Sequence, residues 1–105
     1  MELICPKEVQ KRLKSKDDLV ILDIREGYEL DICGIDAIHV PMDEVQSRLD
    51  EIPSGKDLII MCRSGKRAMA LANLLETDFE YNNVSVMEGG ILRWKELIDS
   101  NLEAY

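Results

Sequence analysis

Residues that bind metals or form disulfides are scarce in this sequence. The three cysteines, Cys5, Cys33 and Cys62, are far apart and form no Cys-x-x-Cys pair, and His39 is the only histidine. A structural zinc site needs four such ligands at close spacing, so the sequence argues against one. An odd number of widely spaced cysteines also argues against a disulfide framework. The simplest interpretation is one reactive thiol and two unreactive ones.

Long apolar runs and an excess of positive charge are also missing. No apolar run approaches the roughly 20 residues that a membrane span needs, and residues 1–7 lack the basic and then apolar pattern of a secretory signal. Lysine and arginine number 13 against 21 acidic residues, a formal net charge of −8. A field of that sign repels phosphate backbones and anionic lipid headgroups. We therefore expect a cytoplasmic protein that binds neither nucleic acid nor membrane, with cations concentrated at any site for an anionic substrate.

The composition is that of an ordinary globular protein. The chain has 105 residues, of which 46% are hydrophobic and 32% are charged. This length suits one domain, and the sequence contains no repeat, low-complexity segment or linker. We expect a single domain over residues 1–105. No heptad pattern is present, so the sequence leaves the oligomeric state open.

Short apolar runs alternate with segments of helical periodicity along the chain. The apolar runs predict strands at 3–4, 19–24, 37–40, 58–61 and 84–87. The helical spacing predicts helices at 6–14, 26–31, 41–49, 67–76 and 91–98. Strands separated by helices indicate an α/β domain built on a largely parallel sheet of about five strands.

The segment 62–67, with the sequence Cys-Arg-Ser-Gly-Lys-Arg, is the most informative part of the chain. It lies between an apolar strand and the start of a helix, and ligand sites in open α/β sheets lie at this end of the strands. A loop that curls into a helix N-terminus directs backbone N–H groups at its centre and favours an anion there. A thiolate at Cys62 would benefit, with its pKa lowered. Gly65 supplies the backbone freedom for a tight curl.

Two interpretations of this segment compete. An isolated cysteine after an apolar strand is more often a small buried residue than a nucleophile. Three cations within five residues, Arg63, Lys66 and Arg67, favour the nucleophile, because such side chains are rarely placed next to a buried strand without cause. They could hold an anionic sulfur donor, although a solvated basic turn would have the same sequence.

Four segments, in this order, resemble the signatures of the rhodanese homology domain, and the resemblance covers nearly the whole chain. They are Asp-Ile-Arg-Glu at 23–26, Ala-Ile-His-Val-Pro at 37–41, the loop at 62–67, and Glu-Gly-Gly-Ile at 88–91 with Trp94. One region departs from the family: many members carry Gly-His-Ile-x-Gly-Ala before the second segment. This chain has Cys-Gly-Ile-Asp-Ala at 33–37 and no histidine there.

The resemblance implies a doubly wound, largely parallel sheet and a sulfurtransferase that carries sulfur as a persulfide on Cys62. The donor would be thiosulfate or another small anion, or a protein persulfide, and the acceptor cyanide, a thiol or a protein cysteine. The substrate-binding loop would comprise Arg63, Ser64, Gly65, Lys66 and Arg67. Covalent catalysis of this kind divides one transfer into two easier ones and needs neither a metal nor an organic cofactor.

Cysteine-dependent phosphatases are the nearest enzymatic alternative. They require Cys-x5-Arg, so that the loop surrounds a phosphate. Here Arg67 follows Cys62 after four residues and the required position holds Ala68. The shorter loop suits a sulfur atom better than a phosphoryl group.

Other polar residues have structural explanations. Asp23 and Arg25 end a predicted strand near the loop, where an ion pair that braces the loop is favoured over contact of Arg25 with the substrate. His39 lies in an apolar strand and is favoured as a packed, hydrogen-bonded residue over a general base.

A non-catalytic role is the second class of function. Rhodanese-like domains also serve as modules for protein interaction or sulfur sensing. Inactive modules usually lack the loop cysteine, and this chain retains Cys62, which favours the sulfurtransferase.

Overall fold

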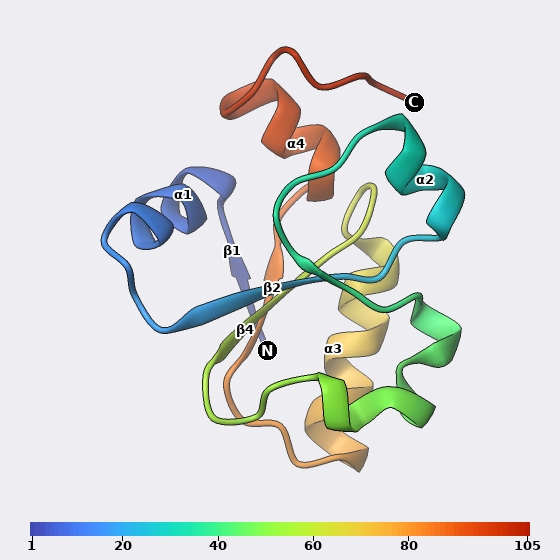
Figure 1. The fold of residues 1–105 in the computed structure, drawn as a ribbon. Helices are drawn as coiled ribbons and strands as arrows, with labels where there is room; N and C mark the ends of the chain where they lie inside the picture. Colours follow the sequence, from blue (N-terminus) through green and yellow to red (C-terminus); the bar gives the residue numbers. More distant parts are fainter.

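The computed structural model describes residues 1–105 and contains five strands and four α-helices (Figure 1). The strands are β1 (Glu2–Ile4), β2 (Leu19–Asp23), β3 (Ile38–His39), β4 (Asp57–Met61) and β5 (Val84–Met87). The α-helices are α1 (Pro6–Lys14), α2 (Gly27–Ile32), α3 (Lys66–Asp78) and α4 (Gly90–Leu97). Two 3-10 turns, η1 (Met42–Glu44) and η2 (Gln46–Glu51), connect β3 to β4.

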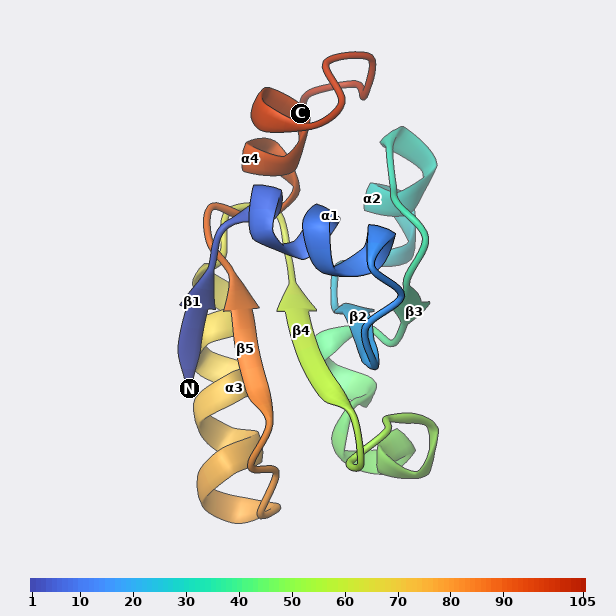
Figure 2. The same cartoon turned by 90° about the vertical axis from the view of Figure 1, so that its left-hand side faces the viewer.

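The strands form one sheet in the order β1-β5-β4-β2-β3, and every neighbouring pair is parallel. The predicted α/β fold with a doubly wound, five-stranded parallel sheet is confirmed. Parallel pairing places the carboxyl ends of all strands at the same end of the sheet. The arrows of β1, β4 and β5 in Figure 2 point the same way. Asp23, the last residue of β2, pairs with Met61, the last residue of β4. The segments that follow these two strands therefore leave the sheet side by side.

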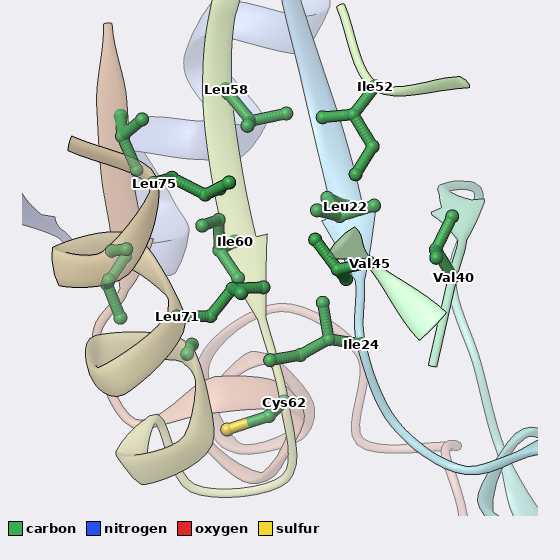
Figure 3. Packing of buried hydrophobic residues seen from close by; sticks show 14 residues of the cluster. Leu22, Ile24, Val40, Val45, Ile52, Leu58, Ile60, Cys62, Leu71 and Leu75 are labelled. Atoms are coloured by element: carbon green, nitrogen blue, oxygen red, sulfur yellow. The ribbon is translucent and has the colours of Figure 1, made fainter. Parts of the chain in front are cut away.

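Alternate residues of the central strands enter two separate apolar clusters, one on each face of the sheet. Leu58 and Ile60 of β4 pack into the cluster beneath α3 and the 3-10 turns (Figure 3). Ile59 and Met61 pack on the opposite face with residues of α1 and α4. This alternation is the strand period of two, and burial on both faces explains why β4 is apolar from Leu58 to Met61.

Helix α3 follows its predicted periodicity closely. Its buried residues are Ala68, Leu71, Ala72 and Leu75, the four positions whose spacing indicated a helix. They form one stripe against the sheet, and the burial of each leucine contributes about 2 kcal/mol. Trp94 of α4 is likewise buried in the second cluster, where it anchors the last helix to the sheet.

The predicted helix at 41–49 is wrong, because the chain forms the two 3-10 turns there instead. Arg48 has φ −125° and ψ 28°, which breaks the helical hydrogen-bond ladder. Its guanidinium pairs with Glu44 and Glu51 at the surface. Only Val45 of this segment is fully buried, and a helix of this length depends on the packing of an apolar face. The predicted strand at 37–40 is shortened to the two residues of β3 at the sheet edge.

Each helix falls short of the length and apolar character that crossing a membrane requires.

Candidate active site

Cys62 directly follows β4, and its sulfur lies in the loop that leads into α3. Its side chain points toward the first turn of α3 at the end of the apolar cluster (Figure 3), and the residue is fully buried. The backbone N–H of Gly65 donates a hydrogen bond of 3.0 Å to Cys62 Sγ. The sulfur is therefore held by a main-chain donor and is not packed as a purely apolar group.

The N-terminus of α3 faces this loop. The helix has 13 residues, enough for a developed macrodipole with its positive end at the loop. Gly65 is its N-cap residue and has φ +101°, in the left-handed region that favours glycine. The predicted curl around Cys62 thus depends on the glycine that the sequence places there.

The start of α4 supports the loop from the other side. The amides of Ile91 and Leu92 donate to the carbonyl oxygens of Cys62 (2.9 Å) and Arg63 (3.2 Å). Gly90 has φ +63°, and a Cβ on it would lie 2.4 Å from both oxygens. The absence of a side chain at Gly90 therefore allows α4 to begin in direct contact with the loop.

Arg67, the last cation of the loop segment, is bound to a buried carboxylate. Its Nη1 and Nη2 donate to the two oxygens of Glu29 in α2, at 2.8 and 2.9 Å. The side chain of Glu29 is only 4% exposed, whereas that of Arg67 is 36% exposed. Hydrogen bonds from Arg67, and further ones from Tyr105 and the backbone of Glu26, lower the pKa of Glu29 to about 2 although burial opposes the shift. Glu29 therefore carries its charge at neutral pH.

Asp23 and Arg25 form the ion pair that the sequence predicted. The guanidinium of Arg25 is fully buried and lies 2.8 Å from Asp23 Oδ2. The nitrogen that makes this contact, Nη2, also donates to the carbonyl oxygen of Cys33; Nε donates to Asp23 Oδ1, and Nη1 donates to Tyr105 Oη and the carbonyl oxygen of Glu29. Every N–H of this side chain has an acceptor within the protein, so none remains for a substrate. Arg25 braces the segment between β2 and α2.

His39 also has the structural role that its position predicted. It is half-buried in β3, and its Nε2 lies 2.7 Å from the carbonyl oxygen of Arg25. This contact ties the edge strand to the turn after β2.

The other loop side chains face solvent. Arg63, Ser64 and Lys66 are all exposed. Arg63 Nη2 donates to the backbone oxygen of Tyr105, and its guanidinium lies 5.0 Å from the centre of the Tyr105 ring. Lys66 has no carboxylate partner. Of the three cations that the sequence singled out, two are engaged within the protein and Lys66 is not.

Sequence reasoning missed two residues of this site, Glu29 and Tyr105. Glu29 forms a capping box with Glu26, and that spacing is visible in the sequence. The capping box locates the helix but gives no sign of the bond to Arg67. No local pattern marks Tyr105. Burial raises its pKa to about 12, so the hydroxyl stays protonated and donates to Glu29.

A groove lies beside the loop, between α3 and the segment that precedes β4. Its volume is about 420 Å³, and Arg67 stands at its wall with Leu71 and Leu74 of α3. A larger, polar hollow of about 540 Å³ lies at the amino ends of β1 and β5, at the opposite edge of the sheet. No three His, Cys, Asp or Glu side chains are grouped so that they could hold a metal ion.

Residues 6–97 match a family model described as the rhodanese-like domain. The chain belongs to the rhodanese-like domain family. As in the sequence-based resemblance, the match extends from α1 through α4 and includes the loop after β4.

Two bacterial relatives of similar length bear on the activity of this rhodanese-like domain. A protein of Allochromatium vinosum named sulfurtransferase is 36% identical over 90 residues, covering 84% of this chain and 82% of the relative. A putative sulfurtransferase of Bacillus subtilis, YtwF, is 28% identical over 89 residues, covering 83% and 84%. These relatives support a sulfurtransferase role for the chain.

Solved structures agree with the fold. A rhodanese-like domain protein from Staphylococcus aureus has a TM-score of 0.83 and 25% identity, with 100% of this chain and 99% of that chain covered. A rhodanese-related protein from Thermoplasma volcanium has a TM-score of 0.81 and 26% identity, with 91% and 92% covered.

Proposed function

We propose that this domain transfers sulfane sulfur through a persulfide on Cys62. The donor is thiosulfate or a persulfide, and the acceptor is a thiophile such as cyanide, a small thiol or a protein cysteine. The observation that carries the proposal is the hydrogen bond from the Gly65 amide to Cys62 Sγ, at the positive end of α3.

In the first half-reaction the Cys62 thiolate attacks the outer sulfur of thiosulfate. A new S–S bond forms to Cys62, the S–S bond of the donor breaks, and sulfite leaves with its electron pair. The product is the persulfide anion Cys62-S-S⁻, so charge and atoms balance without an external oxidant or reductant. The loop amides and the N-terminus of α3 stabilise the negative charge on the Cys62 thiolate before the step and on the persulfide after it.

In the second half-reaction an acceptor nucleophile attacks the outer sulfur of the persulfide. The bond between the two sulfurs breaks, and Cys62 leaves as the thiolate with the electron pair. The enzyme returns to its starting form, and the two half-reactions share one site. This division into two displacements is the advantage of a covalent intermediate.

The loop cations divide their tasks in this proposal. Lys66 and Arg63, both exposed, attract an anionic donor to the loop, while Ser64 and Gly65 shape its backbone. Arg67 fixes the first turn of α3 to Glu29 and contributes its positive charge beside Cys62. The buried ion pair of Asp23 and Arg25 supports this arrangement. Arg25 donates to the Tyr105 hydroxyl, which in turn donates to Glu29.

The same geometry disfavours phosphoryl transfer. A phosphatase loop places an arginine after five residues, where its fork wraps the phosphate. Here that position holds Ala68, which is fully buried in the core, and the fork of Arg67 is bound to Glu29.

The test is the intact mass of the protein after brief incubation with thiosulfate, with and without a reductant. Wild type should gain the mass of one sulfur atom, and reductant should reverse the gain. Cys62→Ser should gain nothing, and Cys33→Ser, a matched cysteine control, should behave as wild type.

A persulfide donor in the same assay separates the alternatives. A gain with the persulfide alone would show that Cys62 carries sulfur and that thiosulfate is not its donor. No gain with either donor would overturn the proposal and favour a non-catalytic interaction module.

A further inference from the structure

The chain after α4 folds back across the site. Residues 98–105 leave α4 and run toward α2 (Figure 1), and they lie beyond the residues that match the family model. Tyr105 ends next to α2, where it contacts residues of three different segments. This placement is not explained by the sulfurtransferase chemistry proposed above.

The hydroxyl of Tyr105 anchors this segment in the buried ion network. It donates to Glu29 Oε2 at 2.6 Å and accepts from Arg25 Nη1 at 3.0 Å. Both partners are buried, so the hydroxyl satisfies polar groups that solvent cannot reach. These two hydrogen bonds therefore hold the Tyr105 ring in place.

The anchored tyrosine engages Arg63, the residue next to Cys62. The Arg63 guanidinium lies over the ring, 5.0 Å from its centre, and one of its N–H groups donates to the Tyr105 backbone oxygen. Cys62 is fully buried in this arrangement. A small anion that uses Arg63 to approach Cys62 must first displace the guanidinium from Tyr105.

We propose that Tyr105 is a specificity-determining residue, which holds residues 98–105 closed over the loop and competes with small anions for Arg63. When residues 98–105 are closed over the loop, anionic reagents react with Cys62 more slowly, relative to neutral reagents, than when the segment is open. When it opens, Arg63 becomes available to an anion. The identification of those anions with sulfur donors rests on the proposed function, whereas the competition for Arg63 does not.

The experiment compares two alkylating reagents of similar size, anionic iodoacetate and neutral iodoacetamide. Cys62 is alkylated in a background with Cys5→Ser and Cys33→Ser, because Cys5 is exposed and Cys33 is partly exposed. The measured quantity is the ratio of the two rate constants at low ionic strength. This ratio reports on charge near Cys62, and a purely steric cover would leave it unchanged.

Tyr105→Ala should raise the iodoacetate to iodoacetamide ratio about fivefold, the size expected when the cation–π contact between Arg63 and the Tyr105 ring is lost. Tyr105→Phe keeps the ring but loses both hydroxyl bonds, and its ratio should rise less. Tyr28→Ala is the matched control, since Tyr28 is 68% exposed on α2 and contacts none of these groups. Its ratio should equal that of the background protein.

A double variant makes the test specific to Arg63. In an Arg63→Gln background, Tyr105→Ala should no longer change the ratio, because the cation for which the tyrosine competes is gone. If Tyr105→Ala accelerates both reagents equally, or changes neither, the proposal is overturned.

Sulfur transfer provides a second readout. Tyr105→Ala should lower the KM for thiosulfate, whereas the control Tyr28→Ala should leave the KM at its background value. If Cys62 accepts no sulfur from any donor but the alkylation ratio shifts, the proposed function fails and the role of Tyr105 stands. If sulfur is transferred and the alkylation ratio does not shift, the proposed function stands and the role of Tyr105 is overturned.

Discussion

The Cα of Gly90 lies so close to the carbonyl oxygen of Cys62 that a side chain on Gly90 would be placed only 2.4 Å from that oxygen. The next amide, that of Ile91, donates to the same oxygen at 2.9 Å. The backbone of the Cys62 loop therefore packs directly against the first turn of α4 and is hydrogen-bonded to it. Gly90 adopts positive φ at this contact, and Gly65, in the loop itself, also has positive φ.

Gly90→Ala should destabilise the protein by about 3 kcal/mol, since alanine in a left-handed conformation costs roughly 1–2 kcal/mol and its methyl group meets backbone that cannot move aside. It should also reduce sulfur uptake by Cys62, because the loop must shift. Urea denaturation measures the loss of stability. Gly55→Ala is the control: a Cβ there meets nothing within 4 Å, and its midpoint should stay close to wild type. Equal midpoints for the two variants would contradict this account of the contact.

Glu29 should make stability depend on pH in the acid range. Its pKa is lowered from an ordinary value of 4.5 to about 2, chiefly by hydrogen bonds from Arg67. A carboxylate with a depressed pKa stabilises the folded state above its unfolded pKa, and this contribution is lost as pH falls from 4.5 toward 2. We expect about 2 kcal/mol, less than the full shift implies because Arg67 is partly exposed to solvent.

The measurement is the free energy of unfolding of wild type and Glu29→Gln between pH 7 and pH 2. The two should differ by about 2 kcal/mol at pH 7 and converge as pH falls to about 2, the folded pKa of Glu29, where most of its contribution has been lost. Glu103→Gln, at an exposed position without a hydrogen-bond partner, should follow wild type throughout. If the difference in the free energy of unfolding between wild type and Glu29→Gln is constant from pH 7 to pH 2, the Glu29–Arg67 pair does not set the pH dependence of stability.

Lys66→Gln should weaken the use of thiosulfate more than that of an uncharged persulfide donor. Lys66 is exposed and unpaired, so its charge acts on an incoming anion and not on the fold. We expect the KM for thiosulfate to rise about fivefold, equivalent to roughly 1 kcal/mol, and the effect to shrink at high salt. Lys11→Gln, an exposed lysine on α1, should have no effect. Equal losses on both donors would assign Lys66 a structural role.

Local patterns predicted most of the framework. The apolar run at 58–61 marked β4, the spacing of Ala68, Leu71, Ala72 and Leu75 marked α3, and Cys62 necessarily fell between them. These elements are visible in the sequence because burial on both faces of a strand, or along one stripe of a helix, imposes a short period. The segment at 41–49 was predicted wrongly because its apolar spacing is weak: only Val45 is fully buried there, and a short helix depends on the packing of an apolar face.

The sequence by itself determined the family, the parallel sheet, and the place of Cys62 in a glycine-containing loop before a helix. The tertiary structure decided which charges act together at that loop: Arg67 binds Glu29, 38 residues away, and Arg63 binds Tyr105, 42 residues away. Such partners carry no periodic signal, because a single long-range contact depends on the folded path of the whole chain. The sequence showed three cations beside a thiol, and only the fold showed that Lys66 alone among them has no protein partner.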